Sequence, residues 1–148
     1  MDLNGSHILN APPDRVWTML MDTDVLARIV PGISTLEKTA ENEYNAVAQV
    51  KMGPVNGSFS GSLTMQDIRA GEGYTLNVQQ NSKIGNADAT VTIDLKPLED
   101  NQTELTFDGK AKLSGLLART GNRVMSGVAN SLTKQFFENF EEEISSTN

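Results

Sequence analysis

The side chains that could carry out acid–base or metal chemistry are scarce in this sequence. It contains one histidine, His7, and no cysteine. The lack of cysteine excludes a thiolate nucleophile, a disulfide framework, a zinc–thiolate site and an iron–sulfur centre. A single histidine excludes a multi-histidine metal site within one chain, and neither a G-x-x-x-x-G-K phosphate loop nor a serine elbow occurs. We therefore assign no catalytic residue, no metal ligand and no covalent or metal cofactor, and we do not expect an enzyme.

His7 is the first candidate for contact with a small molecule. Alternation places it on one strand face together with Leu3, Gly5 and Leu9. We expect this face to form the mouth or wall of an interior cavity, where a neutral imidazole can donate a hydrogen bond to a ligand carbonyl. The alternative is a histidine at the core or the sheet edge whose partner is the backbone.

Further polar side chains fall on faces that are otherwise apolar. Gln80 shares its face with Leu76 and Val78, and a buried amide needs a partner in the protein, in water or in a ligand. Tyr44 and Tyr74 could offer a hydroxyl at the rim of a cavity, or they could simply fill space.

A basic row is predicted on the outer side of the last helix, formed by Arg119, Arg123, Asn130 and Lys134. It could contact anionic lipid headgroups or a partner enzyme, or it could be an ordinary solvated helix face. Glutamates crowd the C-terminal turns of the same helix. They are either solvated or complementary to a basic surface on a partner.

Charge and length restrict the function further. The 148 residues carry 12 Lys and Arg against 19 Asp and Glu, which gives a net charge of -7. Such a chain repels nucleic acid, so no nucleic-acid partner is expected. No window approaches the apolar length that a membrane span needs. We expect one domain over residues 1–148, soluble and located in the cytoplasm.

The hydrophobic period divides the chain into elements that could position these side chains. A strand over residues 3–9 is followed by short helices near 13–20 and 23–30, the second capped by Thr23 or Asp24. A long helix is predicted from Ser114 to Ile144. Between these helices, apolar and polar residues alternate, which predicts strands over the segments 33–39, 43–52, 58–68, 73–82, 87–96 and 103–113. Short turns join these segments, one of them placed only within 53–57, so the sequence predicts an α+β fold in which a curved antiparallel sheet (β-α-α-β-β-β-β-β-β-α) wraps around the C-terminal helix.

Small residues are frequent on the strand faces predicted to point inward, and Gly121 falls in the apolar stripe of the long helix. Small residues on facing elements either leave an apolar cavity for a hydrophobic ligand or allow helix and sheet to pack closely. On the first interpretation, the ligand-binding residues are His7, Tyr44, Phe59, Leu63, Tyr74, Val78, Gln80, Val91, Phe107, Gly121, Met125, Val128 and Leu132.

The order of elements resembles the helix-grip fold of the START/Bet v1-like superfamily. Three stretches are more specific: residues 26–32 (LARIVPG), residues 50–61 (VKMGPVNGSFSG), and residues 121–129 (GNRVMSGVA) leading to Phe136 and Phe137. They resemble the carbon monoxide dehydrogenase CoxG family, in order along nearly the whole chain.

This resemblance implies a non-catalytic accessory protein that links a molybdenum hydroxylase, such as carbon monoxide dehydrogenase, to the membrane and its quinone pool. The expected ligand is a quinone or another lipid, and the expected partners are molybdenum hydroxylase subunits. Members that associate with membranes often have a longer C-terminal tail, whereas this sequence ends at Asn148, so we expect at most transient peripheral contact. The alternatives are a small cyclase- or hydratase-like enzyme using His7 as acid or base, and an assembly factor without a ligand.

Overall fold

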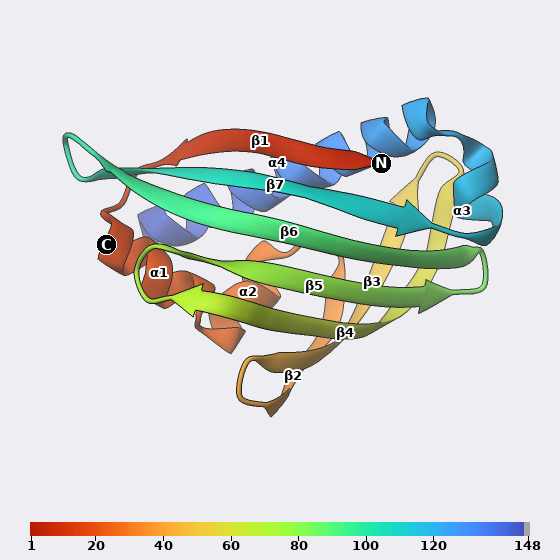
Figure 1. The fold of residues 1–148 in the computed structure, drawn as a ribbon, viewed down its shortest axis with the longest axis horizontal. Coiled ribbons are helices and arrows are strands. Elements are labelled where there is room, and N and C mark those ends of the chain that lie inside the picture. Colours follow the sequence, from red (N-terminus) through yellow and green to blue (C-terminus); the bar gives the residue numbers. More distant parts are fainter. Residues whose placement is uncertain (147–148) are drawn as a thin grey trace.

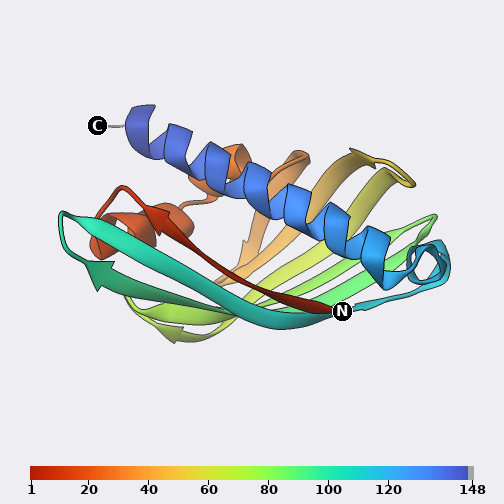
Figure 2. The same cartoon turned by 90° about the horizontal axis from the view of Figure 1, so that it is seen from above.

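The fold is a single curved antiparallel sheet that wraps around one long helix, as Figures 1 and 2 show for the computed structural model of the chain. The structure describes residues 1–146, so the last two residues of the predicted domain lie outside the described part. The elements are β1 (Asp2–Leu9), α1 (Pro13–Leu20), α2 (Thr23–Ile29), β2 (Ile33–Ala40), β3 (Glu43–Met52), β4 (Val55–Arg69), β5 (Gly73–Ser82), β6 (Gly85–Leu98), β7 (Gln102–Leu113), α3 (Gly115–Thr120) and α4 (Asn122–Ser146).

The sheet is a meander in which each strand from β2 to β7 pairs with the next. Within the described residues it has 7 strands in the order β1-β7-β6-β5-β4-β3-β2, so the first strand closes the meander beside the last. All pairings are antiparallel. The predicted α+β helix-grip architecture is therefore confirmed, and the strands lie on the predicted segments with ends shifted by a few residues.

The sequence predicts the connection between β3 and β4 only to within residues 53–57, and the structure shows a shorter turn. Met52 pairs with Val55, so the turn consists of Gly53 and Pro54. Gly53 has a φ of 54°, which glycine adopts without steric cost. Gly57 lies inside β4 opposite Val50.

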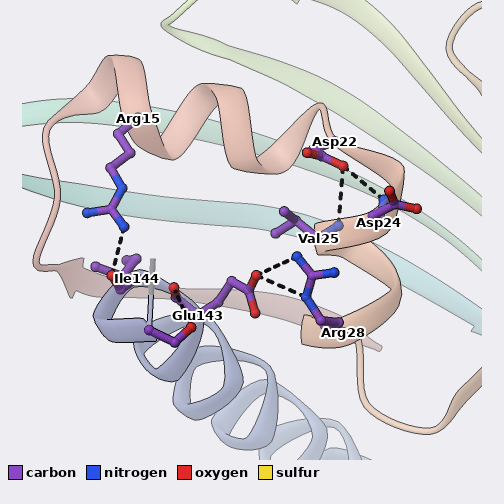
Figure 3. A network of polar contacts seen from close by, with 8 residues as sticks. Arg15, Asp22, Asp24, Val25, Arg28, Glu143 and Ile144 are labelled. Atoms are coloured by element: carbon purple, nitrogen blue, oxygen red, sulfur yellow. Dashed lines mark hydrogen bonds and ion pairs between the residues drawn. The ribbon is translucent and has the colours of Figure 1, made fainter. Parts of the chain in front are cut away.

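The short helices begin at local capping signals. Pro13 and Asp14 open α1, as predicted, because proline loses no needed donor at the first helical position. The cap of α2 is Asp22, and the prediction of Thr23 or Asp24 is wrong. The Asp22 carboxylate accepts hydrogen bonds from the backbone N–H groups of Asp24 at 2.9 Å and Val25 at 3.4 Å (Figure 3). One carboxylate thus satisfies donors that the helix leaves unpaired.

The single long helix predicted from Ser114 is interrupted, and this is the main correction to the predicted elements. Gly121 has φ 99° and ψ 149°, a conformation open to glycine and incompatible with a helix, and it separates α3 from α4. A side chain at Gly121 would have nothing within 4 Å. Gly121 therefore belongs neither to an apolar stripe nor to a cavity wall, and nearby Val124 is 42% exposed.

The C-terminal end of α4 is fixed against α1 and α2 by polar contacts (Figure 3). The Arg28 guanidinium donates to the Glu143 carboxylate, with Nε and Nη2 at 2.9 and 2.6 Å from Oε1. Arg15 donates from Nη2 to the backbone carbonyl of Ile144 at 2.7 Å. The last turn of α4 is therefore held to both short helices.

Apolar packing at the same end forms the larger of the clusters of buried side chains. Phe137, Phe140 and Ile144 of α4 pack there with residues of α1 and α2 such as Leu20 and Ile29. A smaller cluster at the other end of the sheet consists of Val55, Phe59, Leu117, Met125 and Val128. Helix α4 is thus packed at both ends, and the space beneath its middle is bounded by these clusters.

Replacement of Gly121 by alanine tests the helix break. Since its φ of 99° disfavours any residue with a Cβ, we expect Gly121→Ala to lower the free energy of unfolding by about 1–3 kcal/mol. Gly127→Ala is the matched control, because Gly127 lies inside α4 in open space and alanine there should stabilise the helix by about 0.5–1 kcal/mol. Urea unfolding measures both. Equal effects of the two substitutions would contradict the break at Gly121.

Acid should weaken the attachment of α4. The hydrogen bond from Arg28 lowers the pKa of the Glu143 carboxyl, so its stabilising effect is present above the ordinary carboxyl pKa and is lost as the pH falls through the lowered value. We expect Glu143→Gln to lower the melting temperature near neutral pH and to have little effect in strong acid. Glu142→Gln, at an exposed position on the same turn, is the control. A deficit of Glu143→Gln that persists unchanged into strong acid would disprove this role of the Glu143 charge.

Candidate ligand-binding cavity

An apolar cavity of about 400 Å³ lies between the sheet and α4. The concave face of the sheet forms its floor, and the middle of α4 together with α1, α2 and the segment after α2 forms the opposite wall. The lining residues are Leu3, Leu20, Leu26, Val30, Pro31, Leu36, Tyr44, Leu63, Met65, Tyr74, Leu76, Val78, Val91, Ile93, Leu105, Phe107, Leu132, Thr133, Phe136 and Phe137. This volume lies within the range typical of sites for small organic molecules.

Few polar atoms belong to the lining side chains. The Thr133 hydroxyl already donates to the carbonyl of Ala129 at 2.8 Å. Tyr44 and Tyr74 are buried. Burial, with a smaller contribution from Tyr44, raises the pKa of the Tyr74 phenol well above its ordinary value, so this group stays neutral. A neutral, largely apolar molecule therefore suits this cavity, and a charged one would lose its hydration without gaining a partner.

The cavity brings together seven of the predicted ligand-binding residues and leaves the others outside. Those that line it are Tyr44, Leu63, Tyr74, Val78, Val91, Phe107 and Leu132. Phe59, Met125 and Val128 do not, because they fill the smaller cluster at the far end of the sheet. Gly121 is excluded by the helix break. Small residues on the inward faces were compatible with close packing or with a cavity. The far end of the sheet is closely packed, and the middle of the sheet borders a cavity.

Gln80 lies beyond the cavity on the same face of β5, opposite Gly61 and Ala87. Its side-chain nitrogen is buried and has no hydrogen-bond partner. Its partner Gly61 has no room for a side chain, because a Cβ there would meet the backbone oxygen of Gln79. Gln80 thus faces inward, as predicted, with a buried amide nitrogen. It does not line the apolar cavity.

His7 lies outside the cavity, in a separate groove between β1 and α4 of about 790 Å³, which we call the β1–α4 groove. Of the two positions expected for His7, the mouth or the wall of the cavity, the wall is wrong, because His7 is not a lining residue and instead stacks on Phe137, which is one. The imidazole stacks on the Phe137 ring with centroids 4.4 Å apart and planes 9° apart, and its Nε2 is 3.6 Å from Glu141 Oε1. The side chains of Phe107, Thr133 and Phe137 line both the groove and the cavity.

The predicted basic row is divided by the break at Gly121. Arg119 ends up on α3, whereas Arg123 and Lys134 are on α4, and all three are exposed. Lys134 lines the β1–α4 groove together with glutamates of the same helix. The residues therefore do not form one continuous basic face.

Several lining residues were not predicted, and the reason differs between elements. Met65, Leu76, Ile93 and Leu105 occupy strand positions that alternation assigns to the interior, so the signal was present. Leu26, Val30 and Pro31 come from α2 and the segment after it. No local pattern places that segment above the sheet, because its position depends on the contacts with α4.

The remaining features that bear on function are possible metal ligands, the character of the helices and a second hollow. Across residues 1–146, acidic and histidine side chains form no cluster of three or more that could hold a metal ion. In the same part of the chain, none of the helices combines the length and the apolar character needed to cross a membrane. Another hollow of about 820 Å³ has mostly polar residues in its lining, such as Thr64, Asn77 and Lys110.

Replacement of Gln80 by methionine tests the cost of its unpaired amide. A buried donor without a partner costs about 1–3 kcal/mol, so we expect Gln80→Met to raise the free energy of unfolding by about 1 kcal/mol. Gln79→Met is the control, because Gln79 is exposed on the opposite face of β5 and should change little. Chemical denaturation measures both. A loss of stability in Gln80→Met alone would mean that the amide has a partner, such as bound water.

Comparisons with known proteins agree with this architecture. The chain is 32% identical to a conserved protein from Geobacillus kaustophilus, whose crystal structure superposes with a TM-score of 0.96 over 99% of this chain and 97% of that one. A START superfamily protein from Mycobacterium smegmatis shares 9% identity and a TM-score of 0.76, with 99% of each chain covered.

The Zhui aromatase/cyclase from Streptomyces sp. R1128 shares 15% identity and a TM-score of 0.70, covering 97% of this chain and 92% of that one. At such identities these two neighbours establish the fold alone. A search of curated proteins by sequence gave no match. The model of one family, the CoxG proteins of carbon monoxide dehydrogenase, matches residues 5–145. Since this match spans nearly the whole chain, the protein belongs to the carbon monoxide dehydrogenase CoxG family.

Proposed function

We propose that this protein is a non-catalytic accessory protein that carries a hydrophobic small molecule, a quinone or another lipid, in the cavity beneath α4. The observation that carries the proposal is the apolar cavity of about 400 Å³. Its lining matches the tail or ring of such a molecule, and the hydroxyls of Tyr44 and Tyr74 are the groups that a carbonyl could reach. Ligand binding would offset the loss of packing that an empty cavity causes.

The family supplies the partner in this proposal. A member of the carbon monoxide dehydrogenase CoxG family would act beside a molybdenum hydroxylase such as carbon monoxide dehydrogenase, and its ligand would connect that enzyme with the quinone pool. The protein would work in the cytoplasm and touch the inner face of the membrane only transiently. The exposed Arg119 and Arg123 are the cations it would present to anionic headgroups or to the partner.

The alternative of a cyclase- or hydratase-like enzyme has less support from the site. His7, the expected acid or base, lies behind Phe137 in the β1–α4 groove. The titratable side chains on the cavity wall are the phenols of Tyr44 and Tyr74, and a raised pKa makes Tyr74 a weak acid. The shared fold with aromatase/cyclases carries no catalytic residue over, since folds host unrelated functions.

Ligand capture is the direct test. Purified protein is extracted with organic solvent and the extract analysed by mass spectrometry, and a short-tailed ubiquinone is then titrated into ligand-free protein. We expect an extracted quinone or lipid that is recovered chemically unchanged, and a melting temperature that rises with ubiquinone concentration. An empty extract with no thermal shift would support the ligand-free assembly factor instead, and chemical conversion of the ligand would support an enzyme.

A pair of valine substitutions ties any binding to the cavity. Val91 lines the cavity, so Val91→Phe should take up space that the ligand needs and weaken ubiquinone binding by about tenfold or more. Val124→Phe is the matched control, because Val124 is 42% exposed on α4. Circular dichroism verifies that both variants fold. Equal binding by the two variants would place the ligand elsewhere.

A further inference from the structure

The open side of β1 is a feature that the proposed cavity ligand does not use. The strand order ends at β1, which pairs with β7 on one side only. Its other side faces α4 across the β1–α4 groove, and Figure 2 shows the ribbon of α4 passing beside β1. An uncovered strand edge presents backbone donors and acceptors that another extended chain can pair with.

The hydrogen-bond pattern shows which backbone groups are open. Met1 and Ala111 exchange both backbone hydrogen bonds, at 3.0 and 2.8 Å. In an antiparallel ladder every second pair does so, and the register therefore directs the bonds of Leu3, Gly5, His7 and Leu9 toward β7. The backbone N–H and C=O groups that point away from β7 belong to Asp2, Asn4, Ser6 and Ile8, all of them exposed residues.

The opposite edge of the sheet is protected in ways that β1 is not. Strand β2 has register shifts between Ile33 and Thr35 and between Lys38 and Ala40, and it carries charged side chains. Bulges and charges are the usual means of blocking edge-to-edge pairing. The register of β1 is unbroken, and the strand has neither proline nor lysine; its one carboxylate is Asp2, at its first position. The chain thus blocks one edge and leaves the other able to pair.

The charge of the groove indicates what pairs there. Glutamates line its α4 wall at Glu138, Glu141 and Glu142, against one lysine, Lys134. We propose that the open edge of β1 is a docking site for an extended basic segment of a partner protein, which adds a strand to the sheet along β1. Backbone hydrogen bonds to Asn4 and Ser6 would supply affinity, and lysine or arginine side chains facing α4 would pair with the glutamates.

A second copy of this chain is a poor occupant of the same edge. Pairing of two β1 strands would bring together two acidic α4 walls, in a chain whose net charge is already -7. Like charges at such an interface oppose association. The proposal concerns a surface outside the apolar cavity, so it stands or falls independently of the ligand.

The probe for this test is a capped peptide in which lysine and valine alternate over the length of β1, with a glutamate–valine peptide as its counterpart. Each is titrated into the full-length, isotope-labelled protein. We expect the lysine peptide to shift the NMR resonances of β1 and to slow hydrogen exchange of the Asn4 and Ser6 amides. We also expect added salt to weaken the binding of this peptide. Absence of binding, or equal binding of the glutamate peptide, would overturn the proposal.

Substitutions separate the backbone contribution from the charge contribution. Ser6→Pro removes an outward N–H and leaves the bonds to β7 intact, so we expect about tenfold weaker peptide binding. Should this variant fail to fold, the double substitution Glu138→Lys, Glu142→Lys tests the charge, again with about tenfold weakening expected. Its control changes exposed glutamates elsewhere by the same charge, Glu41→Lys with Glu99→Lys. Equal loss in test and control pairs would contradict a local site.

Self-association is the remaining outcome and is measured without peptide. Sedimentation of the protein alone, at the concentrations used for exchange, should show a monomer whose Asn4 and Ser6 amides exchange rapidly. A dimer in which these amides are protected would mean that a second copy occupies the edge, and it would overturn the assignment to a basic partner.

Discussion

The attachment of α4 to α1 and α2 is the constraint on which the rest of this structure depends. Phe137, Phe140 and Ile144 bury their side chains against the short helices, and the Arg28–Glu143 contact orients the last turn. Because a helix is stiff, fixing one end sets its path above the whole sheet. The smaller cluster around Met125 and Val128 supports the other end, and the side chains between these supports leave a cavity of about 400 Å³.

The cavity therefore follows from the spacing of supports along a rigid helix more than from any one residue. Alanine and glycine also occur on the inner faces of the strands, for example at Ala46, Ala89 and Gly109, but none of these three residues lines the cavity. The glycine is needed for another reason, since a Cβ at Gly109 would collide with the backbone of Thr90. Glycine at this position thus allows the close approach of neighbouring strands, and a ligand in the cavity can restore the packing that is lost there.

Sequence reasoning was most successful where structure is local. Alternation and turn residues located β2 to β7, and the inward faces that carry Tyr44, Leu63 and Val91 followed from them. It failed where a local pattern and a backbone requirement compete: helical spacing continues through Gly121, yet its left-handed conformation ends α3. It failed again for His7, because the strand face was right but the position of Phe137 depends on how α4 docks. Contacts between elements distant in sequence leave no periodic trace.

Trp17 can serve as an intrinsic fluorescence probe of the cavity. Its ring contacts Tyr74 edge-on, with the ring centroids 5.9 Å apart. The chain has one tryptophan, so its intrinsic fluorescence comes from a single indole. Tyr74 lines the cavity, and a molecule that contacts Tyr74 from inside would therefore lie one ring away from the indole. Emission from the unlabelled protein senses the contents of the cavity directly, and quinones, as electron acceptors, would quench it.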